Sequence, residues 1–166
     1  MPHIELLDPT HELAGFTSGN SELDAWLATS ALHAQRMHTA RVYVDVEGDR
    51  IVGYFAIAPY LVARSEVPSS IGRGSPQVIP SFLLARLAIS VSNQGKGHGG
   101  ELLVTAIETM LSVMKTGGGR LLVVDAIDDA AISFYSHHGF KALPDNPQRM
   151  FLKASTAAAA LGFSWS

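Results

Sequence analysis

The sequence predicts an α/β fold, and three stretches point to that class. Two β-rich runs surround the turn residues 47–49 within residues 40–60, which is the pattern of a hairpin. The nearly continuous apolar run 121–127 is typical of a strand covered on both faces. Residues 99–115 repeat apolar side chains at helical spacing and end at a run of glycines. A sheet covered by helices accounts for all three.

The other elements follow in chain order from the same signals. A capping-box-like start at Ser21 and Asp24 opens an apolar stripe that predicts one helix to Met37. The Ser-, Pro- and Gly-rich segment 62–80 is too long for a plain turn, which favours a binding loop or lid. The remaining elements are a first strand at 4–8, a strand at 82–90, a short helix after Asp128 that ends before Gly139, and a closing hairpin over FKAL and RMFLKA.

Composition narrows the class of protein. The 166 residues, 47% hydrophobic and 16% charged, predict one domain over residues 1–154 followed by an alanine-rich tail, 155–166, that is expected to fray. No apolar run reaches the ~18 residues of a membrane span, and no signal peptide is visible, so we expect a cytoplasmic protein with no membrane partner. Without cysteines or an HExxH motif among seven histidines, we expect no metal.

A burst of glycines between a strand and a helix, QGKGHGG at residues 94–100, indicates an anion site. The first N–H groups of a helix lack partners and carry partial positive charge, and a phosphate can approach them where no Cβ intervenes. The spacing of Gly95, Gly97 and Gly100 also satisfies the dinucleotide fingerprint GxGxxG, and Asp125 lies where a ribose-binding acid belongs. Too few βα units follow for a Rossmann domain, and a turn without a ligand is the plainer alternative.

Two motifs together resemble a known family. QGKGHG (residues 94–99) resembles the Q/R-x-x-G-x-G/A pyrophosphate loop of the GNAT acyltransferases, and IDDAAISFYSHHGF (residues 127–140) resembles their N-x-x-A-x-x-x-Y-x-x-x-G-F segment. The resemblance covers nearly the whole chain. It implies a mixed, mostly antiparallel sheet with helices on both faces, splayed at the strand that binds acyl-CoA, and acetyl-CoA as co-substrate. One departure is Asp128, which stands where the family has Asn and puts a negative charge near a polyanionic cofactor.

Within the superfamily the chain is most similar to small bacterial toxins. The patches FTSGNSELDAWL, VGYFAIAP, LLARLAIS and AISFYSHHGF resemble the GNAT toxins of type II toxin–antitoxin modules. That resemblance implies acetylation of the α-amine of aminoacyl-tRNA, which blocks translation, and a ribbon-helix-helix antitoxin as partner. A homodimer is left open. The alternatives are acetylation of a small amine or protein N-terminus, and a non-catalytic module that binds acyl-CoA.

The resemblance also implies roles for individual residues. Tyr135 matches the tyrosine that protonates the departing thiolate, although it also reads as a core aromatic, and the backbone N–H of Ile89 is the expected oxyanion donor. Lys96 is either a charge beside the pyrophosphate or a solvated loop lysine. The expected cofactor-binding residues are Leu87, Ala88, Ile89, Gln94, Gly95, Lys96, Gly97, His98, Gly99, Gly100 and Asp128.

No general base stands out, although Glu66, Glu101 and Glu108 are available. An α-amine titrates near ~8 and a lysine near ~10.4, so the missing base favours an α-amine that is already neutral. The net charge of −3 argues against a surface that coats nucleic acid generally. Five arginines either form one basic patch for the tRNA or make ordinary surface contacts: Arg36, Arg41, Arg64, Arg73 and Arg86.

Overall fold

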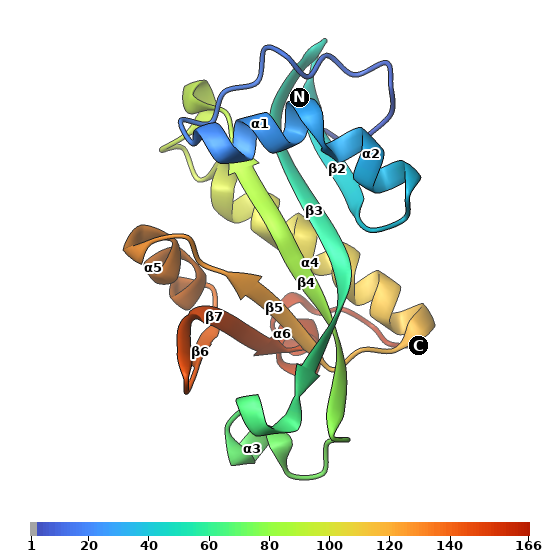
Figure 1. Ribbon diagram of the computed structural model, residues 1–166, viewed down its shortest axis with the longest axis vertical. Coiled ribbons are helices and arrows are strands. Elements are labelled where there is room, and N and C mark those ends of the chain that lie inside the picture. The colour runs from blue at the N-terminus through green and yellow to red at the C-terminus, as the bar shows by residue number, and fades with distance from the viewer. Residues whose placement is uncertain (1–2) are drawn as a thin grey trace. The chain divides into compact units, whose positions relative to one another are not determined.

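The computed structural model describes residues 3–166, and the contacts among them divide the chain into two compact units. The first unit runs to Ala58 and resumes over Ala85–Ala106, and the second unit consists of Pro59–Leu84 and Ile107–Ser166. Each unit has its own cluster of buried hydrophobic residues. Two long strands and one long helix run through both units, so neither unit is a continuous piece of chain (Figure 1).

The strands form a mixed, mostly antiparallel sheet, as the resemblance implied. Hydrogen bonds give the order β1-β2-β3-β4-β5-β7-β6, in which β4 and β5 are parallel and the pairs β1/β2, β2/β3, β5/β7 and β6/β7 are antiparallel. The last pair between β4 and β5 is Leu84 with Val124, and β4 continues beyond it, as a splayed acyl-CoA strand requires. The bounds are β1 His3–Leu6, β2 Arg41–Glu47, β3 Arg50–Ala63, β4 Val78–Ile89, β5 Leu121–Asp125, β6 Lys141–Leu143 and β7 Asn146–Lys153.

The helices match the predicted ones except at the N-terminal end. The single helix expected over 21–37 is two helices, because the chain leaves helical geometry at Ser30. The N-cap of the first of these two helices is Asn20, whose side chain accepts from the Leu23 N–H at 3.0 Å. The capping box expected at Ser21 is therefore wrong. The bounds are α1 Ser21–Thr29, α2 Ala31–Arg36, α3 Ser69–Gly72, α4 His98–Gly117, α5 Asp129–His137 and α6 Ala154–Leu161, with 3₁₀ turns at Arg64–Glu66 and Val91–Asn93.

The first unit buries the apolar faces of α1 and α2 on strands β2, β3 and β4. The period of two along β3 places Tyr54 in this core, where it lies among Leu27 of α1, Ala31 of α2 and Ala88 of β4. Gly53 lies on the opposite face, and a Cβ there would be 3.2 Å from a methyl of Leu102 in α4. Helices therefore cover both faces of this part of the sheet, which agrees with the predicted fold.

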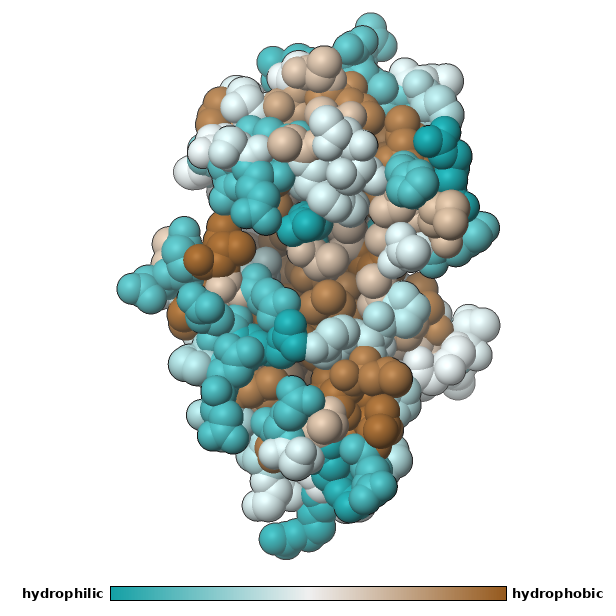
Figure 2. Space-filling view, in the orientation of Figure 1, coloured by the Kyte–Doolittle hydropathy of each residue, from teal (hydrophilic) through white to brown (hydrophobic). Residues whose placement is uncertain are grey.

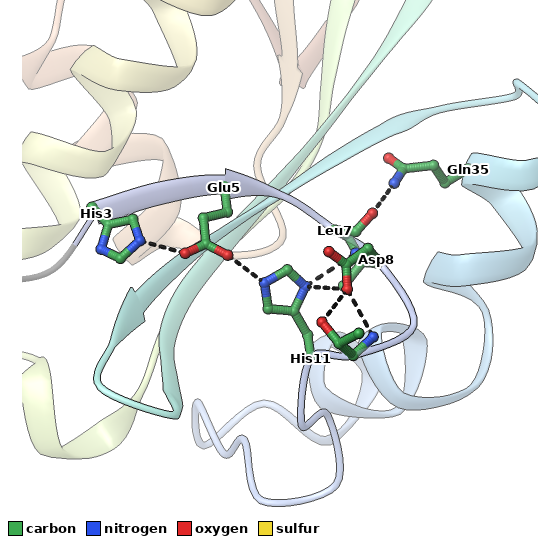
Figure 3. Close-up of polar contacts among 7 residues, drawn as sticks. His3, Glu5, Leu7, Asp8, His11 and Gln35 are labelled. Carbon is green, nitrogen blue, oxygen red and sulfur yellow. Dashed lines mark hydrogen bonds and ion pairs between the residues drawn. The ribbon is translucent and has the colours of Figure 1, made fainter.

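A polar network anchors the N-terminal segment of the first unit (Figure 3). Nδ1 of His11 accepts from the backbone N–H of Asp8 at 3.0 Å, so Nε2 carries the ring proton and donates it to Glu5 at 2.8 Å. His3 also contacts the Glu5 carboxylate, and the hydrogen bonds from His11 and His3 lower the pKa of Glu5. The side chain of Gln35 reaches from α2 to a backbone carbonyl just after β1. These contacts fix the segment that leads to residues 17–19.

Two stretches of the second unit contain more regular structure than the sequence predicts. The expected loop or lid over 62–80 contains a 3₁₀ turn and α3, and its Val67 and Ile71 are buried in the core of this unit. The alanine-rich end forms α6, which packs against β7 and buries Ala154, Ala157 and Ala158. Small side chains let a helix approach a strand closely, so residues 154–161 are helical where fraying was expected.

Hydrophobic side chains also reach the surface. Figure 2 shows them in patches between hydrophilic groups on the face that it draws. On β3 and β4 of the second unit, Leu61 is 66% exposed and Val78 is 52% exposed. None of the helices formed by residues 3–166 is long and apolar enough to span a membrane.

Candidate active site

The glycine-rich segment forms the entry to helix α4. Gly95 has φ 77° and Gly97 has φ 81°, a left-handed conformation that glycine adopts readily and other residues rarely. A Cβ at either position would have no atom of the described chain within 4 Å, so this side of the loop is open. The Glu101 N–H donates to the Gly97 carbonyl at 3.2 Å, which leaves the N–H groups before it at the free N-terminus of α4. This geometry suits the anion site that the sequence predicts, and the binding itself stays a prediction.

The side chain of Gln94 joins this loop to two other segments. Its amide nitrogen donates to the carbonyl of Ser18 at 2.7 Å and to the carbonyl of Ile89 at 2.8 Å. The backbone N–H of Val91 also donates to the carbonyl of Thr17 at 2.9 Å. The sequence predicts Gln94 as a cofactor-binding residue but not these side-chain contacts, because no local pattern indicates a partner 76 residues away. The loop is therefore held in place by the end of β4 and by the N-terminal segment.

The end of β4 presents backbone N–H groups on the edge that faces away from β3. The Ser90 N–H donates to the Val52 carbonyl of β3 at 2.9 Å. Because N–H groups alternate between the two edges of a strand, those of Ile89 and Leu87 point to the other edge. The Ile89 carbonyl also points there and accepts from Gln94. Ala88 packs its side chain into the core of the first unit, so this stretch is fixed by both side chain and backbone.

Tyr135 lies in the second unit, on α5. Its ring is 8% exposed and contacts Phe134 and Phe140 edge to face, with ring centroids 5.2 and 5.7 Å away. Burial raises the pKa of Tyr135 to about 12. The hydroxyl therefore remains protonated at neutral pH. The ring of Tyr135 is thus a core aromatic, and its expected role as the acid stays a prediction.

Asp128 acts as the N-cap of α5. Its carboxylate accepts from the Ala131 N–H at 2.8 Å, as the sequence predicts for a helix beginning at this position. The carboxylate thus serves the helix that carries Tyr135. Its expected contact with the cofactor stays a prediction.

The five candidate arginines have different surroundings. In the first unit, Arg36 is exposed at the end of α2, and Arg41 donates to the Gln35 carbonyl at 3.2 Å. Arg86 lies over the ring of Trp26, with its guanidinium carbon 5.0 Å from the ring centroid. In the second unit, Arg64 donates to the Ser75 carbonyl at 3.0 Å and Arg73 is exposed just after α3. The patch proposed for them stays a prediction.

The three candidate bases have no partner that marks one of them for catalysis. Glu66 accepts from the Ala63 N–H at 3.0 Å, Glu101 lies 3.7 Å from His98, and Glu108 is exposed. Asp45 is a further carboxylate, which no sequence pattern marks as a candidate base. Partial burial raises its pKa. It lines a shallow cavity of the first unit with His3, His98, Glu101 and Leu102. Within residues 3–166, no group of three or more His, Asp or Glu side chains is arranged to hold a metal.

Comparison with known proteins gives consistent matches. Residues 38–142 match the family model described as acetyltransferase (GNAT) domain. A tRNA-acetylating toxin of Mycobacterium tuberculosis (strain ATCC 25618 / H37Rv) is 33% identical over 151 residues, which is 91% of this chain and 91% of that protein. Among solved structures, AtaT complexed with acetyl-methionyl-tRNAfMet has a TM-score of 0.90 at 28% identity, over 99% of this chain and 100% of that one. An AtaT mutant toxin bound to the C-terminus of the antitoxin AtaR and acetyl-CoA has a TM-score of 0.84 at 25% identity, over 98% and 99%.

Proposed function

The chain belongs to the GNAT acetyltransferase family, and we propose that it transfers the acetyl group of acetyl-CoA to the α-amine of an aminoacyl-tRNA. The observation that carries the proposal is the open glycine loop at the N-terminus of α4, fixed by Gln94 to the end of β4. Similarity over more than nine-tenths of a tRNA-acetylating toxin supports the choice of acceptor. By blocking the amine that translation needs, such an enzyme acts as a toxin.

The residues of the first unit fit the cofactor. The N–H groups of residues 94–100 and the positive end of the α4 dipole suit a pyrophosphate, and Lys96 is exposed beside them. The free edge of Leu87–Ile89 suits the amides of a pantetheine arm, in the manner of an added strand. When bound, acetyl-CoA supplies an activated thioester. Asp128, in the second unit, caps α5, and its expected contact with the cofactor remains part of the proposal.

Two groups of the chain assist the transfer. The Ile89 N–H, on the free edge of β4, donates to the oxygen that gains charge when the amine attacks. The Tyr135 hydroxyl donates a proton to the departing sulfur, and its raised pKa keeps that proton available throughout the neutral range. A free α-amine has a pKa of ~8, and an aminoacyl ester has a lower one, so much of it is neutral at pH 7 and can attack without a base. The proton that the amine loses after the attack passes to water, and Tyr135 regains its proton from solvent.

The proposal also covers the RNA contacts, the protein partner and the location of the enzyme. Arg36, Arg41, Arg64, Arg73 and Arg86 supply cationic groups for the RNA, and because the net charge is −3 the attraction has to be local rather than general. The antitoxin bound to the related AtaT supports an antitoxin partner here, which we propose is a ribbon-helix-helix protein encoded next to this chain. Both substrates occur in the cytoplasm, where we place the enzyme. Analytical ultracentrifugation of the purified chain tests whether it forms a homodimer.

Labelled acetyl-CoA provides the test. The purified chain should label tRNA that carries its amino acid and leave deacylated tRNA unlabelled, and expression in bacteria without an antitoxin should arrest growth. Labelling of polyamines or peptide N-termini, with every charged tRNA unlabelled, would replace this proposal by the small-amine or N-terminal alternative. Binding of acetyl-CoA without transfer to any amine would favour the non-catalytic module.

A further inference from the structure

Arg86 differs from the other half-buried arginines in lacking a polar partner. Arg41 donates to a carbonyl at 3.2 Å, and Arg149 forms a two-bonded pair with Asp125 at 2.7 and 2.9 Å. The Nε of Arg86 is buried, and none of residues 3–166 accepts a hydrogen bond from it. A buried donor without an acceptor lowers the stability of a fold, and more so when the group is charged. Such a group in a folded protein calls for an explanation.

The surroundings of Arg86 hold it in one orientation. Its guanidinium lies over Trp26, and on α1 and β3 the Trp26 ring in turn stacks with Tyr54, at a centroid distance of 6.2 Å and an angle of 11° between planes. The Tyr54 hydroxyl donates to the Leu23 carbonyl at 2.7 Å, which fixes that ring. The aromatic pair therefore supports the cation without satisfying its N–H groups.

The acids near this cluster do not neutralise it. Asp24, on the same helix as Trp26, accepts from the Ser18 N–H at 2.9 Å and from the Ser18 hydroxyl at 2.6 Å. Its oxygens are thus used to hold the turn before α1. The outer N–H groups of the Arg86 guanidinium therefore lie beside a buried Nε in a partly desolvated place, where a hydrogen bond to an incoming oxygen is strong.

The position of Arg86 on β4 connects it to the reaction. Alternation along the strand puts its side chain on the same face as Ala88, the face that α1 and α2 cover. Ile89, the proposed oxyanion donor, follows three residues later, roughly 10 Å along the strand. A long arginine side chain can therefore reach an acceptor molecule whose amine attacks a thioester placed at Leu87–Ile89. All of these residues belong to the first unit.

We propose that the guanidinium of Arg86, held flat on Trp26, presents its outer N–H groups to an oxygen of the acceptor substrate close to its reacting amine. The inference rests on the proposed function. Two oxygens of an aminoacyl-tRNA 3′ end have the required chemistry, the ester carbonyl beside the amine and a phosphate of the terminal nucleotides. Arg86 is then a specificity residue that selects an α-amine with an oxygen acceptor nearby, whereas the other arginines supply only general attraction.

The variant Arg86→Met tests this assignment, because Met retains an apolar stem on Trp26 and removes every donor. We expect the KM for charged tRNA to rise at least tenfold, the Kd for acetyl-CoA to stay constant, and the urea midpoint of unfolding to stay constant or rise. Arg50→Met, at an exposed hairpin arginine of the same unit, is the control and should leave all three unchanged. A lower urea midpoint for Arg86→Met would make Arg86 a structural residue, and an unchanged KM would equally overturn the proposal.

A second arm separates the two oxygens. The methyl ester of the accepted amino acid keeps the carbonyl and has no phosphate. A raised KM for both the ester and the charged tRNA assigns Arg86 to the carbonyl, and a raised KM for the tRNA alone assigns it to a phosphate. Measurements on the wild-type chain separate a failure of the proposed function from a failure of the Arg86 inference. If it labels no charged tRNA, the proposed function fails, and if it labels tRNA with a KM that Arg86→Met leaves unchanged, only this inference fails.

Discussion

Helices α4 and α5 begin in opposite ways. The N-terminus of α4 follows two glycines with positive φ and lies open, whereas the N-terminus of α5 is closed by the Asp128 carboxylate at 2.8 Å. Both helices have unpaired N–H groups and partial positive charge at this end. A helix that supplies its own anion needs no ligand there, and one that supplies none can bind an external anion. The contrast supports the proposal that α4 binds the cofactor and that α5 positions a side chain.

The largest expected effect tests the role of α5. Tyr135→Phe retains the ring that packs on Phe134 and Phe140 and removes only the hydroxyl. We expect kcat to fall about 10²-fold or more, with little change in the Kd for acetyl-CoA, because general acid catalysis is worth that much. Tyr43→Phe, at a half-buried tyrosine stacked on Phe55, is the control and should keep the wild-type kcat. A Tyr135→Phe enzyme as fast as the wild type would leave Tyr135 a core residue.

The next effect tests the open end of α4. Gly97→Asp places a negative charge in the anion site, and we expect acetyl-CoA to bind at least tenfold more weakly, about 1.4 kcal/mol, by calorimetry. Gly48→Asp is the matched control, because Gly48 also has positive φ and open space around it, in the β2–β3 hairpin. Both variants should lose similar stability, about 1 kcal/mol. Equal acetyl-CoA affinity in the two variants, or NAD binding by the wild type, would contradict the assignment.

A smaller effect tests the closed end of α5. Asp128→Ala removes the cap, so we expect the free energy of unfolding to fall by about 1 kcal/mol in urea titrations. Asp128→Asn can still accept from Ala131 and should keep the wild-type stability. Asp129→Ala, in the first turn but not at the cap, should cost less than Asp128→Ala. If Asp128→Asn destabilises as much as Asp128→Ala, the charge matters more than the hydrogen bond.

The smallest expected effect concerns the pH dependence of kcat/KM, which should not decline in the ordinary titration range of a tyrosine. The raised pKa of Tyr135, about 12, means that its acid form persists as pH rises, so deprotonation should begin to reduce kcat/KM only above about pH 11. Below that, the rate should rise with pH as the substrate amine loses its proton, and then level off. The pH profile of kcat/KM measures this. A decline near pH 10, abolished in Tyr135→Phe, would show that the hydroxyl titrates at its ordinary pKa.

Local sequence patterns predicted most of the fold and the backbone of the site. The apolar period predicted α4, and the continuous apolar run predicted β5. The predicted N-cap at Asp128 is confirmed by the hydrogen bond that its carboxylate accepts. These features depend on residues a few positions apart. The glycine loop was likewise predictable, because positive φ and open space are what glycine permits.

Contacts between distant segments were not predictable. The break at Ser30 changes the backbone angles of one residue, and the cap at Asn20 lies one residue before the expected cap. Helix propensity does not resolve differences of this size. The partners of Gln94 and the missing partner of Arg86 depend on which segments the fold brings together. The division into two units has the same origin, since β3, β4 and α4 contribute to both.

The bond from Gln94 to Ser18 has a consequence for how the protein assembles. It closes a loop of 76 residues, and an entropic cost that grows as (3/2)RT ln n amounts to roughly 4 kcal/mol before constants. Non-local contacts of this kind form late on a folding pathway. We therefore expect the cofactor loop to reach its final conformation only after the N-terminal segment has docked on β4. A nascent chain without this docking should be inactive. An N-terminal fusion that disturbs residues 17–19 should also lower activity, because these residues contact the cofactor loop although they are distant from it in sequence.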